Sequence, residues 1–233
     1  MIPLKDDNPT SRAAVLTMLL IAANVVVFGW QVTHPRGMEW VVLAYGVIPV
    51  EVLTGTRVGP SGIVPPPFTT LSSMFLHGSV AHLLFNMLFL WIFGNNIEDA
   101  LGRVRFVLFY LACGVAAALV QIVVSGPSDI PMVGASGAIA GVLGAYLVLY
   151  PHARVLTLVP IFIFIQFIWL PAGLFLAIWF IFQLVSSFGG GGGVAWYAHI
   201  GGFVAGVVLI KLLAPRVRPR RAARAVDWSD YRR

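Results

Sequence analysis

Four polar residues that could together perform nucleophilic chemistry stand in otherwise apolar parts of this sequence. They are Ser136, His199, His82 and Asn86. A serine hydroxyl activated by a histidine base is a common protein nucleophile. His82 and Asn86 can both donate hydrogen bonds, and at four residues apart they share one helix face. Because polar side chains are costly in hydrocarbon, their presence indicates a bundle interior, a water-filled cavity or a working site.

The elements that carry these residues are predicted to be membrane-spanning helices. Of the 233 residues, 59% are hydrophobic and only 10% are charged, whereas a soluble domain is about a quarter charged. A bilayer core of about 30 Å needs roughly 20 apolar residues as helix. The uncharged stretches then divide into six spans, at 13–33, 79–97, 104–124, 135–150, 167–187 and 195–213. The predicted fold class is an all-α polytopic membrane protein, a bundle of six transmembrane helices.

The basic residues predict how these spans are oriented. An even number of spans puts both ends of the chain on the same side. With the ends in the cytoplasm, only Arg36 and Arg57 fall in outer loops, as the positive-inside rule requires. We therefore predict a cytoplasmic N-terminal segment (1–12), a membrane domain (13–213) and a basic cytoplasmic tail (214–233).

This topology brings the four polar residues together. The second, fourth and sixth spans all run from outside to inside, so their polar residues lie at similar depth near the outer ends of three helices. Gly202 and Gly206 follow His199 at +3 and +7, which makes a surface that another helix can approach closely. The fourth span carries a matching stripe of small residues. If these two faces meet, Ser136 lies within reach of His199.

The fourth span is also short, which predicts the depth of the serine. Residues 136–150 make about 22 Å of helix at 1.5 Å per residue, less than the bilayer core. Ser136 is therefore expected beneath the outer membrane surface. Water must then reach it through a cavity open to the outside and roofed by the loop 125–133.

Two apolar segments do not fit simple spans. Residues 40–50 are too short to cross a bilayer, so we expect them at the outer interface or at the edge of the bundle. Residues 155–169 are interrupted by Pro160 and followed by Pro171. For them we expect a partly re-entrant or interfacial connection before the fifth span.

Several other chemistries are excluded or disfavoured. Cys113 is the only cysteine, so neither an intrachain disulfide nor a Cys-rich zinc site is possible. The sequence has no His-Glu-x-x-His zinc motif and no Gly-x-x-x-x-Gly-Lys phosphate loop. Most of the net charge of +6 lies in the tail 214–233, which fits an anionic membrane surface or the positive-inside rule better than nucleic acid. We expect no metal, no cofactor and no nucleic-acid partner.

Five short motifs follow one another between residues 68 and 213. They are Phe75-Leu76-His77-Gly78, His82 to Met87, Phe93-Gly94 to Glu98, Gly134-Ala135-Ser136-Gly137, and Ala198-His199-Ile200-Gly201-Gly202 through Gly206. Together they closely resemble the rhomboid family of intramembrane serine proteases, in its bacterial six-span type. The resemblance implies that Ser136 is the nucleophile and His199 the general base. It also implies that His82, Asn86 and the N–H of Ser136 bind the oxyanion.

The same resemblance implies the partners and the location. The substrates would be membrane proteins with a transmembrane helix, hydrolysed in or near that helix by a Ser–His dyad. The protein would be a multi-pass protein of the bacterial inner membrane, in contact with the lipid bilayer. The sequence does not determine the oligomeric state.

One departure from the family pattern concerns the general base, and alternatives follow from it. Many members carry a bulky aromatic residue four positions after the nucleophile, stacked on the base, whereas this chain has Ala140. The orientation of His199 is thus left open. The alternative function is a catalytically inactive relative that binds client membrane helices. A transporter is disfavoured because the spans are apolar on the cytoplasmic side of Asn86 and Ser136. A catalytic triad would need a carboxylate, and Asp129 could provide it only if its loop folded back.

Overall fold

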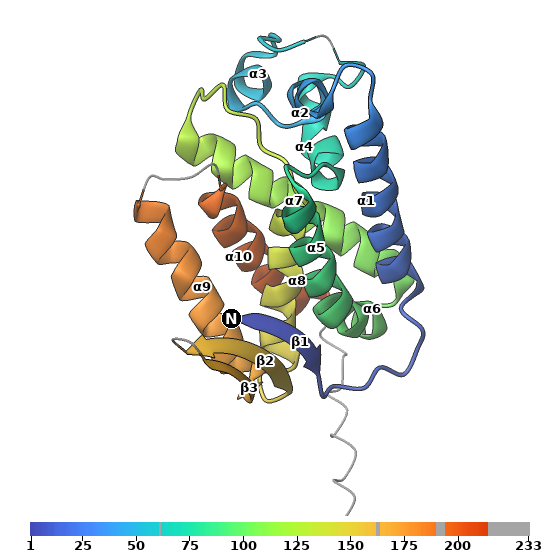
Figure 1. The fold of residues 1–233 in the computed structure, drawn as a ribbon, viewed down its shortest axis with the longest axis vertical. Coiled ribbons are helices and arrows are strands. Elements are labelled where there is room, and N and C mark those ends of the chain that lie inside the picture. Colours follow the sequence, from blue (N-terminus) through green and yellow to red (C-terminus); the bar gives the residue numbers. More distant parts are fainter. Residues whose placement is uncertain (61, 162–163, 190–193, 214–233) are drawn as a thin grey trace, which may run out of the picture.

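The fold is a bundle of helices with a small sheet at one end (Figure 1). The computed structural model describes residues 1–60, 62–161, 164–189 and 194–213. The basic tail that the sequence predicts at 214–233 lies outside the described residues. The sheet and the N-terminus lie at one end of the bundle, and the short helices α2 (Met38–Tyr45) and α3 (Pro49–Thr54) lie at the other.

Each of the six predicted spans contains a helix. The second span is a continuous run of α5 (Val80–Phe89), the π-helical η3 (Leu90–Gly94) and α6 (Asn95–Leu101). The others are α1 (Val15–Thr33), α7 (Arg103–Ser125), α8 (Ser136–Leu149), α9 (Ala172–Phe188) and α10 (Trp196–Leu213). By length and apolarity, α1, the α5–α6 run, α7 and α10 can each cross a membrane, while α8 and α9 are shorter apolar helices. The chain is a mostly helical membrane protein, as predicted, and the count of six crossings stays a prediction.

Local interactions define where several helices begin and end. Gly102, between α6 and α7, has a φ of +77°, and Gly126, after α7, has a φ of +65°. Glycine adopts such angles without steric cost. Glu98 is a buried residue of α6. Its carboxylate accepts hydrogen bonds of 3.0 and 2.7 Å from the N–H groups of Leu16 and Thr17, at the start of α1. This carboxylate satisfies N–H groups that a helix start leaves unpaired and lies at the positive end of the helix dipole.

Helix α8 is the centre of the bundle. Its residues from Gly137 to Tyr146 are all buried, and it packs most extensively against α10. The two backbones nearly touch: a Cβ atom at Gly202 would collide with the carbonyl oxygen of Gly137, and one at Gly206 with that of Gly141. The prediction that these helices meet through small residues is therefore confirmed.

We expect Gly206→Val to destabilise the folded protein by about 1–3 kcal/mol or more, because its side chain would force α10 away from α8. The measurement is thermal denaturation of the purified protein in detergent. Gly29→Val is the matched control, since Gly29 lies in α1 with no atom within 4 Å of where its Cβ would be. A Gly206→Val variant as stable as Gly29→Val would contradict the tight contact.

The segment 40–50 lies at the edge of the bundle, one of its two expected locations. It contributes to α2 (Met38–Tyr45) and α3 (Pro49–Thr54), and Val41 and Ala44 are fully buried. The chain then passes through η1 (Pro66–Phe68), α4 (Thr69–Ser72) and η2 (Ser73–Phe75) to reach α5. Val47 and Met132 pair through two backbone hydrogen bonds, of 3.0 and 2.7 Å. This pairing ties the segment between α2 and α3 to the loop that precedes α8.

The connection before the fifth helix differs from the expectation. In the segment 155–169, expected to be partly re-entrant or interfacial, the described residues lie in two antiparallel strands, β2 (Arg154–Ile161) and β3 (Phe164–Pro171). β1 (Ile2–Asp6) pairs with β2, which gives the order β1-β2-β3. In this arrangement the backbone polar groups bond to one another. The fifth helix consequently begins at Ala172 and not at 167, and the sheet is an addition to the predicted all-α fold.

The N-terminal segment is attached to the same end of the bundle as the sheet. The hydroxyl of Tyr146 in α8 donates a hydrogen bond of 2.6 Å to Asp6, and Arg154 forms an ion pair of 2.9 Å with Asp7. The Ser11 hydroxyl donates to Asp99 at 2.7 Å. Residues 1–12 are thus packed against the membrane domain, and their cytoplasmic location stays a prediction.

Candidate active site

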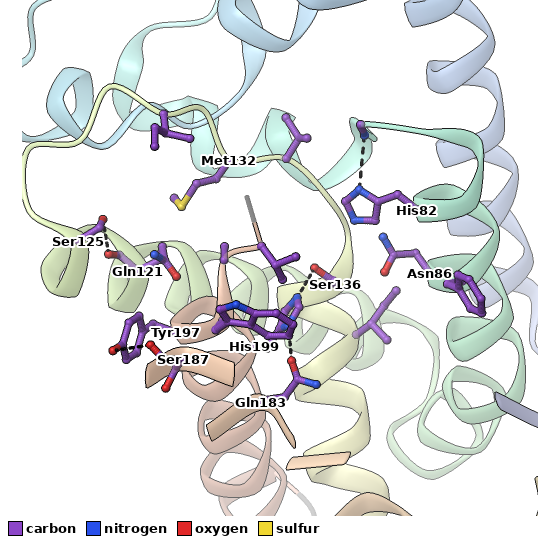
Figure 2. A pocket seen from close by; sticks show the side chains of 18 of the residues that line it. His82, Asn86, Gln121, Ser125, Met132, Ser136, Gln183, Ser187, Tyr197 and His199 are labelled. Atoms are coloured by element: carbon purple, nitrogen blue, oxygen red, sulfur yellow. Dashed lines mark hydrogen bonds between the residues drawn. The ribbon is translucent and has the colours of Figure 1, made fainter. Parts of the chain in front are cut away.

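The N-terminal ends of three helices, α5, α8 and α10, line one cavity of about 890 Å³. Its lining includes His82 and Asn86 from α5, Ser136 from α8 and His199 from α10. Figure 2 shows His82 and Asn86 reaching from α5 toward the side of the cavity where Ser136 and His199 point at each other. The structure therefore brings all four candidate residues together, from parts of the chain up to 117 positions apart.

Ser136 and His199 form a direct hydrogen bond. The distance from Ser136 Oγ to His199 Nε2 is 2.7 Å. Ser136 is the first residue of α8, and both residues are partly exposed to the cavity. The close packing of α8 on α10 holds the two side chains in register. A neutral imidazole whose Nε2 is free of a proton can accept the serine proton in this geometry.

His82 presents a donor toward the serine. Its Nδ1 accepts a hydrogen bond from the N–H of Gly78 at 3.4 Å, so in the neutral ring the proton lies on Nε2. A Cβ atom at Gly134 would lie 2.8 Å from His82 Nε2 and 3.5 Å from Ser136 Oγ. Gly134, with a φ of +129°, thus occupies the narrow space between the two side chains, where a larger residue would collide with His82.

Asn86 is buried on the same face of α5, one turn further along. Its Nδ2 atom has no hydrogen-bond partner among the described residues. A buried amide donor without a partner is energetically costly, and such groups are rare in folded proteins. Since Asn86 lines the cavity, its free donor is available to a group that enters there.

His77 lies behind His82 and contributes no charge to the site. Its backbone exchanges hydrogen bonds of 2.9 and 3.1 Å with the side chain of Gln31. Its ring packs edge-on against that of His82, with centroids 5.1 Å apart. Burial, with a smaller contribution from His82, lowers the pKa of His77 to about 4. At neutral pH the side chain next to His82 is therefore uncharged.

Two glutamines complete the surroundings of His199, and the sequence analysis missed both. Gln183 Oε1, from α9, lies 2.8 Å from His199 Nδ1. Gln121 Oε1, from α7, accepts a hydrogen bond of 3.0 Å from the N–H of Ala198, at the start of α10. The available signal for Gln183 was its polarity, because it stands alone among apolar residues from 174 to 185. Asp129, which could have completed a triad if its loop folded back, is not the partner of His199 Nδ1. The partner is the neutral amide of Gln183.

Ala140, where an aromatic residue would be expected from the family resemblance, has no open space around it. Ala140 is fully buried, and the glycine contacts between α8 and α10 leave the two helices close together. The aromatic neighbours of His199 come from other positions. Trp179 and Trp196 have ring centroids 6.1 Å from that of His199, the second in an edge-on arrangement. The His199 ring is thus flanked by indoles instead of covered by a residue of α8.

The cavity walls also show how the site is bounded. The loop between α7 and α8 contributes Ile130 and Met132, in agreement with the predicted roof over Ser136. Phe85 of α5 and Phe182 of α9 line another side, and about half of each side chain is exposed. That side of the cavity therefore lies between α5 and α9. In the described ranges, no group of three or more His, Cys, Asp or Glu is placed to hold a metal ion.

Comparison with known proteins shows the family to which the sequence is similar. The family model described as the rhomboid domain matches residues 67–216. The mitochondrial rhomboid protein 1 of Saccharomyces cerevisiae is 29% identical over 255 residues, which cover 95% of this chain and 70% of the yeast protein. Rhomboid protease GluP of Bacillus subtilis is 46% identical over 77 residues, or 33% of this chain and 15% of that protein. The mitochondrial presenilin-associated rhomboid-like protein of Mus musculus is 39% identical over 97 residues, 40% of this chain and 26% of the mouse protein.

Proposed function

The chain belongs to the rhomboid family, and on this premise we propose that it is an intramembrane serine endopeptidase. It would hydrolyse peptide bonds in or near the transmembrane helices of other membrane proteins. The observation that carries the proposal is the hydrogen bond of 2.7 Å between Ser136 Oγ and His199 Nε2 at the wall of a large cavity. Relatives named as rhomboid proteases are consistent with this chemistry.

The reaction begins with attack by Ser136 on the scissile carbonyl carbon. His199 Nε2 takes the hydroxyl proton as the Ser136 Oγ–carbon bond forms, and then gives that proton to the leaving amine. A water molecule, activated by the same histidine, hydrolyses the resulting acyl-enzyme and frees Ser136. No metal or cofactor takes part in this scheme, which needs only a nucleophile and one base.

The negative charge on the carbonyl oxygen is stabilised by three donors. Asn86 Nδ2 lacks another partner among the residues described, and His82 carries its proton on the nitrogen that faces Gly134 and Ser136. The N–H of Ser136 lies in the first turn of α8, where backbone N–H groups have no acceptor within the helix. The positive end of the α8 dipole points the same way. These donors are in place before the reaction, so they favour the transition state over the ground state.

A substrate helix would reach the cavity between α5 and α9. Phe85 and Phe182 line this side and are exposed, and in Figure 1 α9 stands at the edge of the bundle. Since helical carbonyls are hydrogen-bonded, the substrate must unwind locally before Ser136 can attack. Residues that weaken a helix, such as glycine, therefore favour cleavage at the bonds near them.

The location and topology belong to the same proposal. The inner segments carry most of the basic residues, which supports cytoplasmic ends for both 1–12 and 214–233. The relatives include mitochondrial proteins of yeast and mouse as well as bacterial ones. The protein is thus placed in a membrane, and the bacterial inner membrane stays a prediction that these relatives do not single out.

The experiment is a cleavage assay with the purified protein in detergent or liposomes. A set of single-span test proteins, with and without glycine near the outer end of the span, is incubated with the protein and followed on a gel. A fluorophosphonate probe, which reacts covalently with activated serines, is tested in parallel. Cleavage together with labelling at Ser136 is the expected result. A protein that binds the test helices without cleaving them, and that the probe does not label, would instead be an inactive client-binding relative.

A further inference from the structure

The catalytic proposal leaves open how His199 is held in the right tautomer. In a neutral imidazole one nitrogen carries a proton and the other accepts one. For Nε2 to accept the Ser136 proton, the proton of the ring must lie on Nδ1, so Nδ1 needs an acceptor. In many serine hydrolases a buried carboxylate provides it. Here the partner of Nδ1 is Oε1 of Gln183, at 2.8 Å, as the dashed line in Figure 2 shows.

The orientation of the Gln183 amide follows from its other hydrogen bond. Its Nε2 donates to the carbonyl oxygen of Trp179, one turn earlier in α9, at 3.4 Å. If the amide were turned over, its oxygen would face the Trp179 carbonyl and its NH₂ group would face His199. The Gln183 oxygen and the Trp179 carbonyl oxygen are both acceptors, so no hydrogen bond could form between them. The observed orientation pairs every contact, with Oε1 accepting from Nδ1–H.

Gln183 is also placed where this hydrogen bond has a large effect. Its side chain is only 4% exposed, although α9 as a whole presents many apolar side chains outward. A buried amide is costly unless it is hydrogen-bonded. The local bond to Trp179 satisfies only its NH₂ group, so the oxygen depends on His199. The two residues consequently restrict each other: Gln183 fixes the imidazole, and His199 satisfies Gln183.

From this geometry we propose that Gln183 is a positioning residue that orients His199 and keeps its proton on Nδ1. During the reaction the proton moves from Ser136 Oγ to His199 Nε2 and on to the leaving amine. The Nδ1 proton stays on the ring and continues to bond to Gln183, because an amide oxygen does not accept a full proton at neutral pH.

Two substitutions of similar size separate positioning from packing. Gln183→Met keeps the length of the side chain and removes the acceptor, whereas Gln183→Glu keeps an oxygen that can accept from Nδ1–H. Ile181→Met is the matched control, since Ile181 lies on the exposed face of α9, outside the cavity lining. For each variant we would measure kcat and KM on a single-span substrate, the rate of fluorophosphonate labelling at Ser136, and thermal stability.

We expect Gln183→Met to lower kcat and the labelling rate by about 10- to 100-fold, the range for loss of one hydrogen bond to a group that becomes charged. KM should change by less than about twofold, since the substrate is bound as before. Gln183→Glu should retain most of the activity, and Ile181→Met all of it. A wild-type kcat for Gln183→Met, or equal losses of activity in Gln183→Met and Gln183→Glu, would overturn the positioning role.

The inference rests on the proposed protease activity, and the two can fail separately. If the wild-type protein neither cleaves nor reacts with the probe, the protease proposal is wrong and the role of Gln183 falls with it. If the wild type is active and Gln183→Met is equally active, the protease proposal stands and only the positioning role is wrong.

Discussion

Ser136→Ala is expected to abolish proteolysis, lowering kcat by about 10⁴-fold or more. The change removes the only atom that forms the covalent bond to the substrate in the proposed reaction, and loss of a nucleophile in a serine protease has effects of this size. Alanine fits the first turn of α8 without new contacts, so the fold should be kept. Cleavage of a single-span substrate and fluorophosphonate labelling are measured beside thermal denaturation. Both activities should disappear while the denaturation temperature changes little.

The matched control for this prediction is Ser186→Ala. Ser186 lies in α9, outside the lining of the cavity, so its loss should leave cleavage and labelling unchanged. His199→Ala should resemble Ser136→Ala in cleavage, because the serine then has no base at 2.7 Å. Probe labelling at a residue other than Ser136, or cleavage by Ser136→Ala at the wild-type rate, would place the nucleophile elsewhere.

Asn86→Ala is expected to lower kcat by about 10²- to 10³-fold, the range for loss of one donor to an oxyanion. The free Nδ2 atom of Asn86 has nothing to bind in the described resting structure, so its hydrogen bond forms only with a group in the cavity. Because the charge on the substrate oxygen develops in the transition state, KM should change far less than kcat. Steady-state cleavage kinetics at several substrate concentrations provide both constants.

Two further variants test whether this effect is specific. Asn24→Ala removes another buried asparagine, in α1, whose Nδ2 bonds to the carbonyl of Leu20 away from the cavity; it should leave kcat unchanged. His82→Ala removes the second donor and should also lower kcat by at least about tenfold. If Asn86→Ala raised KM and left kcat unaltered, Asn86 would contact the substrate without stabilising the oxyanion.

Most of the helices could be predicted from the sequence because hydropathy is a local property. Most of α1, α7 and α10 lies in uncharged stretches that are long enough to cross a bilayer, and the helices begin and end within two residues of the predicted bounds. The small residues of the fourth and sixth spans also predicted which faces would meet. From orientation and packing together, Ser136 was expected to lie within reach of His199, and the structure places their side chains in direct contact.

The sheet could not be predicted in this way. Its first strand, Ile2–Asp6, pairs with residues more than 140 positions later in the chain, beginning with Ile2 opposite Leu158. Strand pairing of this kind depends on which segments the rest of the fold brings together. The apolar run 155–169 is compatible with a buried helix, a membrane segment or a strand, since a short apolar run has no distinguishing period. The strand is selected by the pairing of β2 with β3 on one side and with the N-terminal strand β1 on the other.

The sequence by itself determined the membrane class, most of the helices and four of the polar residues that line the cavity, Ser136, His199, His82 and Asn86. These follow from composition, from spacing along single helices and from the direction in which each span runs. The tertiary structure alone decided what holds His199 in place. The hydrogen bond from Nδ1 to Gln183 joins α10 to α9, and it depends on the rotation of each helix about its own axis. The spacing of residues within one helix does not specify this rotation, because the rotation results from the packing of both helices against α8 and against each other.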